Sequence, residues 1–95
     1  MVDVELHNLG NVELRRGNVD QAERYFAECR ELDSDDPYAV ALTAFNEAAI
    51  ALGRGDRERA TTLFARGESV LGESGINLAT DDRADVDWLR GRLAG

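Results

Sequence analysis

The sequence predicts an all-α fold in which helical hairpins stack into a right-handed superhelix of about five helices. A single proline interrupts the 95 residues, and apolar residues recur at a rough 3.6-residue period along most of the chain. In addition, two segments, GNVDQAERYF and GDRERATTLF, repeat one pattern of glycine, capping residue, alanine and phenylalanine. A helical period combined with an internal repeat is typical of stacked helical hairpins.

The first hairpin is predicted at about residues 3–36. Asp3 can cap a first helix that ends at Gly17, a residue suited to the left-handed conformation that closes many helices. Asn18 then caps a second helix, which ends in the acidic stretch 33–36. The apolar positions of this second helix are Ala22, Tyr25, Phe26, Cys29 and Leu32.

The second hairpin is predicted at about residues 37–72. It begins at Asp36 and Pro37, a capping carboxylate followed by proline at the first helical position. Its first helix ends near the glycines at 53 and 55, and Asp56 caps the next helix.

A capping helix is predicted at about residues 80–94, after a glycine-containing loop. Thr80 or Asp81 supplies its N-cap. Its apolar residues are Ala84, Trp88, Leu89 and Leu93. Trp88 is expected to close the core, with a role as an interface aromatic as the alternative. Residues 1–95 are thus predicted to form one domain.

Three landmarks recur at a constant spacing of 38 residues. They are Gly17 with Gly55, Ala22 with Ala60, and Phe26 with Phe64. The first hairpin, LHNLGNVELRRGNVDQAERYFAECRELDSDDP, resembles the tetratricopeptide repeat in its Leu-x-x-Leu-Gly pattern, its turn glycine and its Ala-x-x-x-Phe pattern. Gly10 and Ala22 are small where the two helices are expected to cross closely, and Phe26 fills the space beside them.

The second hairpin resembles the family less closely. Ala48 stands where Gly10 does, but Glu47 stands where Leu9 does, and the 38-residue spacing exceeds the usual repeat of about 34 residues. The resemblance implies a non-catalytic scaffold that binds a protein or peptide on its concave face. The C-terminal segment GINLATDDRADVDWLRGRLAG also resembles the helical-repeat regions of large bacterial transcriptional regulators. An oligomerisation or structural segment of such a regulator, or a relative of one, is therefore the alternative.

The resemblance implies a set of partner-binding residues on the first and third helices: His7, Asn11, Arg15, Leu42, Phe45, Asn46 and Ala49. The sequence leaves open whether the apolar members of this set meet a partner or pack against the first or last helix. A homodimer is a further expectation, because stacked repeats generally need about three units for stability and two are present here.

Composition narrows the partner class. The net charge is −8, and all eleven basic residues are arginine. This balance argues against nucleic acid and anionic membranes, and it favours a basic or apolar partner over an acidic one. The chain contains no apolar run of the roughly 18 residues that span a membrane. The single cysteine, Cys29, offers no disulfide and suits the cytoplasm, where a buried, inert thiol is expected.

The sequence predicts neither catalysis nor a cofactor. His7 is the only histidine, and no nucleophile is placed beside it. Asp33, Asp35 and Asp36 lack the turn glycine and terminal glutamate of a calcium loop, so capping and linking are the expected roles. Gly53 and Gly55 follow no strand and precede no lysine, which excludes a phosphate-binding loop.

Overall fold

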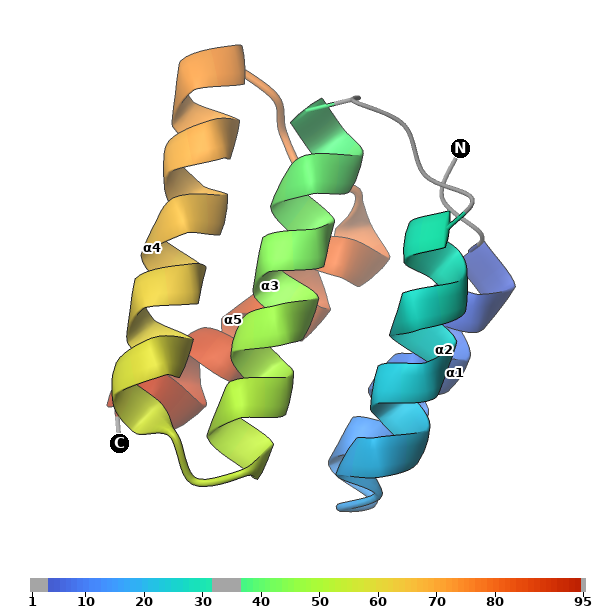
Figure 1. Cartoon of the computed structure of the whole chain (residues 1–95). Helices are drawn as coiled ribbons and strands as arrows, with labels where there is room; N and C mark the ends of the chain where they lie inside the picture. The colour runs from blue at the N-terminus through green and yellow to red at the C-terminus, as the bar shows by residue number, and fades with distance from the viewer. Residues whose placement is uncertain (1–3, 32–36, 95) are drawn as a thin grey trace.

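The structure, a computed structural model, describes residues 4–31 and 37–94, apart from a few side chains within the helices, His7 and Cys29 among them. These residues form five helices and no strand, so the predicted all-α fold with about five helices is confirmed (Figure 1). The helices are α1 (Val4–Arg15), α2 (Val19–Glu31), α3 (Pro37–Gly53), α4 (Arg57–Ser74) and α5 (Thr80–Ala94). None of these described helices is both long and apolar enough to cross a membrane.

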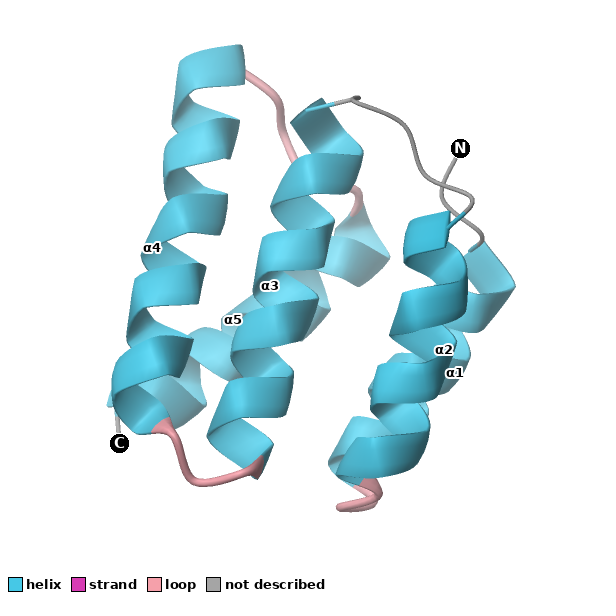
Figure 2. Cartoon of the chain, viewed as in Figure 1, coloured by secondary structure: helices cyan, strands magenta, loops and turns pink. Residues whose placement is uncertain are grey.

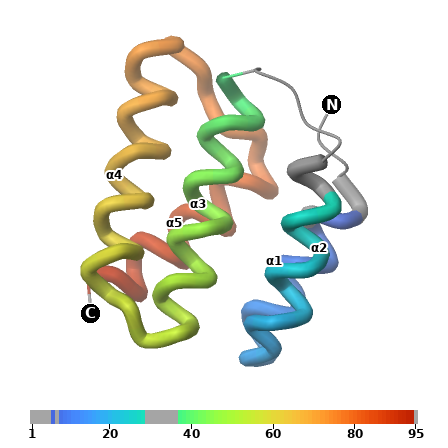
Figure 3. The backbone as a smooth tube through the Cα atoms, in the orientation of Figure 1, coloured from blue at the N-terminus to red at the C-terminus, as the bar shows by residue number. Residues whose placement is uncertain are grey.

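The first four helices form two antiparallel hairpins that stand side by side, α1 with α2 and α3 with α4 (Figure 2). The fifth helix does not continue this row. In the trace of Figure 3, α5 passes behind α3 and ends near the start of α4. The side chain of Arg57, at the start of α4, donates to the carbonyls of Arg92 and Leu93 near the end of α5, which confirms that placement.

The two hairpin turns have the same geometry at the predicted spacing. Gly17 and Gly55 have φ angles of 85° and 84°, in the left-handed region that glycine adopts without strain. The N–H of each residue that follows, Asn18 and Asp56, bonds to a carbonyl five residues earlier, at 2.8 and 2.9 Å. This is the hydrogen bond of a Schellman helix end. Asp56 also caps α4 as predicted, because its carboxylate accepts from the N–H of Arg59 at 3.1 Å.

Within each hairpin, a glycine on one helix lies against a phenylalanine on the other. A Cβ atom at Gly10 would lie 2.8 Å from Cδ1 of Phe26, and one at Gly67 would lie 2.7 Å from Cε1 of Phe45. Such distances are shorter than any ordinary carbon contact. The close crossing expected at Gly10 is therefore present, while the sequence did not indicate the pair formed by Gly67 and Phe45.

We expect Gly10→Ala to destabilise the protein, although alanine is the better helix former by about 1 kcal/mol. The added methyl group must displace the buried Phe26 ring, and overpacking of this kind costs about 1–3 kcal/mol. Gly72→Ala is the matched control, because Gly72 also lies in a helix but has no atom within 4 Å of its added Cβ. Urea denaturation should show a loss of stability for Gly10→Ala and a gain for Gly72→Ala. A gain for both would show that the helices of the first hairpin can separate at little cost.

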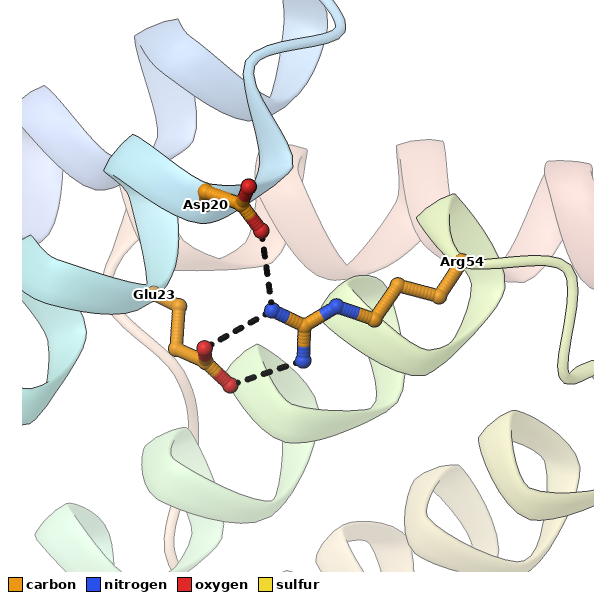
Figure 4. A network of polar contacts seen from close by, with 3 residues as sticks. All are labelled: Asp20, Glu23 and Arg54. Carbon is orange, nitrogen blue, oxygen red and sulfur yellow. Dashed lines mark hydrogen bonds and ion pairs between the residues drawn. The ribbon is translucent and has the colours of Figure 1, made fainter.

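The two hairpins meet at the lower end of α2 and α3 in Figure 1. Figure 4 shows Arg54 donating to both oxygens of Glu23, at 2.7 and 2.9 Å, and to Asp20 at 3.1 Å. The hydrogen bonds to Glu23 and, to a smaller extent, to Asp20 raise the pKa of Arg54 above its ordinary value, so the guanidinium remains charged. Beneath this exposed contact, Gly53 lies against a methyl group of Val19. Salt screens exposed ion pairs, so the arginine orients the hairpins more than it stabilises them.

Candidate protein-binding face

The side of α1 and α3 on which partner binding was predicted is covered by α5. We call the described residues of this side the α1–α3 face: Asn11, Arg15, Leu42, Phe45, Asn46 and Ala49. Five of them, all but Arg15, line a small cavity together with Val86, Trp88 and Leu89 of α5. The cavity measures about 20 Å³, room for about one water molecule, whereas pockets for small ligands measure about 300–1,000 Å³. With α5 in place, this cavity has no room for a small molecule.

The apolar contact between α5 and this face is narrow. Only Val86 and Leu89 of the 15-residue helix are buried, at 4% and 2% exposure, and Leu93 is partly buried. These residues are three and four positions apart, so they lie on one side of α5. Burial of a valine or leucine side chain contributes about 1.5–3 kcal/mol, so each of the two buried residues is a large part of an apolar attachment to which Leu93 and Trp88 also add.

Polar contacts anchor the middle of α5 to α1. Asp85 accepts a hydrogen bond from the amide nitrogen of Asn11 at 3.1 Å and another from the guanidinium of Arg15 at 2.9 Å. Asp85 is half-buried and Arg15 is more exposed. A carboxylate that accepts from a charged donor forms a stronger hydrogen bond than a neutral pair. Asn11 and Arg15 therefore act on this face as donors to an acidic group.

Tyr38 of α3 anchors the start of α5. Its hydroxyl group donates to the carboxylate of Asp82 and accepts from the N–H of Ala79 at 2.9 Å. Ala79 holds the N-cap position, because its carbonyl accepts the first helical bond, from the N–H of Arg83 at 2.8 Å. In an ordinary capping box, the side chain three residues after the N-cap reaches back to the N-cap N–H directly. Here the Tyr38 hydroxyl stands between Asp82 and that N–H.

The start of α5 thus differs from the prediction. Thr80 or Asp81 was expected to be the N-cap, but the helix already includes both residues. The physical reason is the Tyr38 hydroxyl, which satisfies the backbone N–H of Ala79 although alanine has no acceptor in its side chain. Asp81 and Asp82 then lie in the first turn, at the positive end of the helix dipole, where negative charge is favourable.

Arg57 and Arg90 anchor the other end of α5 to α4. Arg57 donates to the carbonyls of Arg92 and Leu93 at 3.0 and 2.8 Å, two groups that receive no partner within the helix. Arg90 forms an ion pair with Glu68 at 3.2 Å and lies over the ring of Phe64, 5.4 Å from its centroid. Each of α1, α3 and α4 therefore contributes at least one polar anchor to α5.

Six of the seven predicted partner-binding residues are brought together here. The apolar members Leu42, Phe45 and Ala49 are 5%, 3% and 8% exposed. Of the two alternatives that the sequence left open, the structure shows packing against the last helix, and these side chains do not meet solvent. His7 lies in α1, but its side chain is outside the described residues, as is that of Cys29. Asp3 and residues 32–36 are also outside the described residues. The predictions for Asp3, Leu32 and the three aspartates at 33, 35 and 36 therefore stay predictions.

Trp88 does not close the core, and this part of the prediction is wrong. It is 36% exposed, and the guanidinium groups of Arg15 and Arg92 each lie 5.4 Å from its ring centroid. Val86, which the prediction did not include, takes the inner position with Leu89. Because successive helical residues are 100° apart, a helix that turns Val86 and Leu89 inward turns Ala84 outward and leaves Trp88 at the edge of the covered side, where its ring lines the cavity and is partly exposed.

We expect Tyr38→Phe to loosen α5 without unfolding the hairpins. The variant loses a hydrogen bond to a carboxylate, worth about 1.5–3 kcal/mol, and leaves the N–H of Ala79 without this acceptor. Burial and the hydrogen bond to Asp82 raise the pKa of Tyr38 above its ordinary value. A raised pKa means that the stabilisation is complete below about pH 10 and is lost as the pH rises through the higher folded-state value.

Thermal unfolding from about pH 7 to pH 11 tests this prediction. The difference in stability between wild type and Tyr38→Phe should be constant up to about pH 10 and should shrink above it. Ultraviolet absorbance should show a late-titrating phenolate in the wild type that is missing from the variant. A difference that does not change with pH would contradict a role for the hydroxyl proton.

The chain matches no protein-family model, and comparisons with curated proteins and with solved structures return no significant match. The resemblance to the tetratricopeptide repeat therefore stays a prediction from the residues quoted above. Among the described residues, no group of three or more histidine, cysteine, aspartate or glutamate side chains is placed to hold a metal ion.

Proposed function

We propose that this chain is a non-catalytic protein-interaction module that binds a peptide or a partner helix on the α1–α3 face. The observation that carries the proposal is that this face already holds a helix. α5 lies on it through two buried apolar side chains and through carboxylates that meet Asn11, Arg15 and Tyr38. A groove that accepts an amphipathic helix in this way is a recurring mode of peptide recognition. A cytoplasmic setting, inferred from the single cysteine, belongs to the same proposal.

Binding on this face requires that α5 move aside. Its limited apolar contact supports this step, because only two side chains of α5 are fully buried. A partner that supplies the same contacts with a larger apolar surface would replace α5 at a modest cost. α5 then acts as the resting occupant of the site.

Selection of a random peptide library against the 95-residue chain tests the proposal. Bound peptides should change the amide NMR signals of α1 and α3 on the α1–α3 face and should speed hydrogen exchange in α5. A library that yields no binder would sink the proposal, and so would binders that change only the outer surfaces of α2 and α4.

The runner-up function, self-association or stacking on a neighbouring helical segment, is favoured by one separate observation. Leu9 and Val12 of α1 are 39% and 44% exposed, although both are large apolar residues. Light scattering during size exclusion, at low and high salt, should then show a dimer that is lost in Val12→Arg. Because Val12 is exposed, this substitution leaves the core intact. A monomer at all concentrations would remove this candidate.

A further inference from the structure

The α1–α3 face presents hydrogen-bond donors, although the protein as a whole is strongly acidic. Arg15 and Asn11 donate to Asp85, and the hydroxyl of Tyr38, which lies on α3 beside this face, donates to Asp82. Donors from both helices of the face therefore meet acidic groups of α5. The two acidic groups lie on the same side of α5, because Asp82 and Asp85 are three residues apart on the helix.

The apolar contacts continue along the same side toward the C-terminus of α5. Val86, Leu89 and Leu93 follow the two aspartates on the covered side. Together they give the pattern Asp-x-x-Asp-Φ-x-x-Φ-x-x-x-Φ, where Φ is an apolar residue. The groove and the pattern fit each other in both charge and apolar spacing.

We propose that the α1–α3 face recognises an acidic amphipathic helix of this pattern in a partner protein, and that α5 is the internal copy of that ligand. This inference rests on the proposed function and specifies its ligand. It differs from the expectation of a basic partner, which followed from the net charge of −8. At physiological salt, charges separated by more than about 8 Å are largely screened. The donors within 3.1 Å of Asp85 therefore outweigh the distant acidic residues.

The attachment of α5 within the same chain sets the strength of the competition. The short connection between Gly75, which ends α4, and Thr80, which begins α5, keeps α5 close to the face. A short linker gives an effective concentration of about millimolar. A free helix with the same contacts is therefore a weak competitor in the wild type and a strong one when the attachment of α5 is reduced.

The test uses the whole 95-residue chain and a labelled synthetic peptide that copies residues 80–94, TDDRADVDWLRGRLA. Its affinity is measured by fluorescence anisotropy for wild type and for Leu89→Ala, the variant with reduced attachment. The peptide should bind Leu89→Ala at least about 10-fold more tightly than wild type, because competition from α5 is weaker. Circular dichroism and the hydrogen exchange of α1–α4 verify that the variant keeps its two hairpins.

Two peptide variants of identical composition decide whether the carboxylates are recognised. An Asp85→Asn peptide loses the group that meets Arg15 and should bind about 10-fold more weakly. An Asp87→Asn peptide is the control, because Asp87 is exposed and pairs with Arg90 of its own helix. Equal affinities of the two variants would overturn the inference, as would tighter binding of a peptide with lysine in place of all four aspartates.

The outcomes also separate this inference from the proposed function. If library peptides bind the α1–α3 face but carry basic or uncharged sequences, the interaction module stands and the acidic ligand is wrong. If neither the library nor the α5 peptide binds, both fail. If the wild type is a dimer that the α5 peptide dissociates, the α1–α3 face binds α5 of a second copy of this chain. That result would overturn the inference that the ligand belongs to a different protein.

Discussion

Phe45→Ala is expected to destabilise the fold by about 3–5 kcal/mol, the range measured for buried aromatic residues. Phe45 is 3% exposed, and its ring centroid lies 5.2 Å from that of Phe64 on α4. The same ring lies against Gly67 and lines the cavity beneath α5. Removal of the ring therefore opens a void between α3, α4 and α5 at once. A loss of this size is a large part of the roughly 5–15 kcal/mol that stabilises a typical domain.

Urea denaturation measures this effect as a lower midpoint at an unchanged slope. Val40→Ala is the control, because Val40 lies on the same helix but is 38% exposed. It should change stability by less than about 0.5 kcal/mol. A loss below about 1 kcal/mol for Phe45→Ala would mean that neighbouring side chains refill the space. The described junction of three helices would then not depend on this ring.

The local structure of the hairpins could be predicted from the sequence because it depends on residues close together in the chain. Gly17 and Gly55 adopt the conformation that their neighbours and their position after a helix require. Asp56 caps α4 because its side chain needs only to reach the N–H three residues later. The close contact at Gly10 followed from a small residue placed opposite Phe26 in the hairpin.

The placement of α5 could not be predicted from its own periodicity. The helix contains two overlapping apolar sets, one with Ala84 and Trp88 and one with Val86 and Leu89. Periodicity alone does not decide between them, and the large surface of tryptophan favoured the wrong set. The packing of α5 against the α1–α3 face selects the set with Val86 and Leu89, which are buried.

The contacts of Tyr38 were equally hidden in the sequence. They join residues 41 and 44 positions apart, and a lone tyrosine one residue after Pro37 carries no signal of its future partners. Arg54 and Arg57, which flank the turn between α3 and α4, likewise contact other helices. Arg54 contacts α2 and Arg57 contacts α5. Such pairs depend on how whole helices cross, which a local pattern does not specify.

The second large effect is expected for Leu89→Ala, where α5 should detach while the two hairpins remain folded. Leu89 is 2% exposed, and replacement of a buried leucine by alanine costs about 2–5 kcal/mol. What remains of the attachment is Val86 and the hydrogen bond from Tyr38 to Asp82, worth about 1.5–3 kcal/mol each, and ion pairs that contribute about 0–1 kcal/mol each where they are exposed. The substitution therefore removes a large share of the stabilisation that holds α5 on this face.

Native-state hydrogen exchange separates local detachment from global unfolding, because each amide reports the free energy of its own opening. In Leu89→Ala, the α5 amides should lose protection while those of α3 and α4 retain most of theirs. Arg83→Ala is the matched control on the same helix. The side chain of Arg83 is exposed, so its removal should leave α5 in place.

The result also decides how the α1–α3 face can act. If α5 opens alone, Leu42, Phe45 and Ala49 become accessible without loss of the scaffold that positions them, as partner binding requires. If all five described helices lose protection together, α5 is an integral part of the core. Displacement of α5 would then cost the full stability of the domain, about 5–15 kcal/mol, and the binding free energy of a micromolar complex, about 8 kcal/mol, lies near the low end of that range. A partner helix would in that case have to bind outside this face, and the exposed side of α1 with Leu9 and Val12 would become the better candidate.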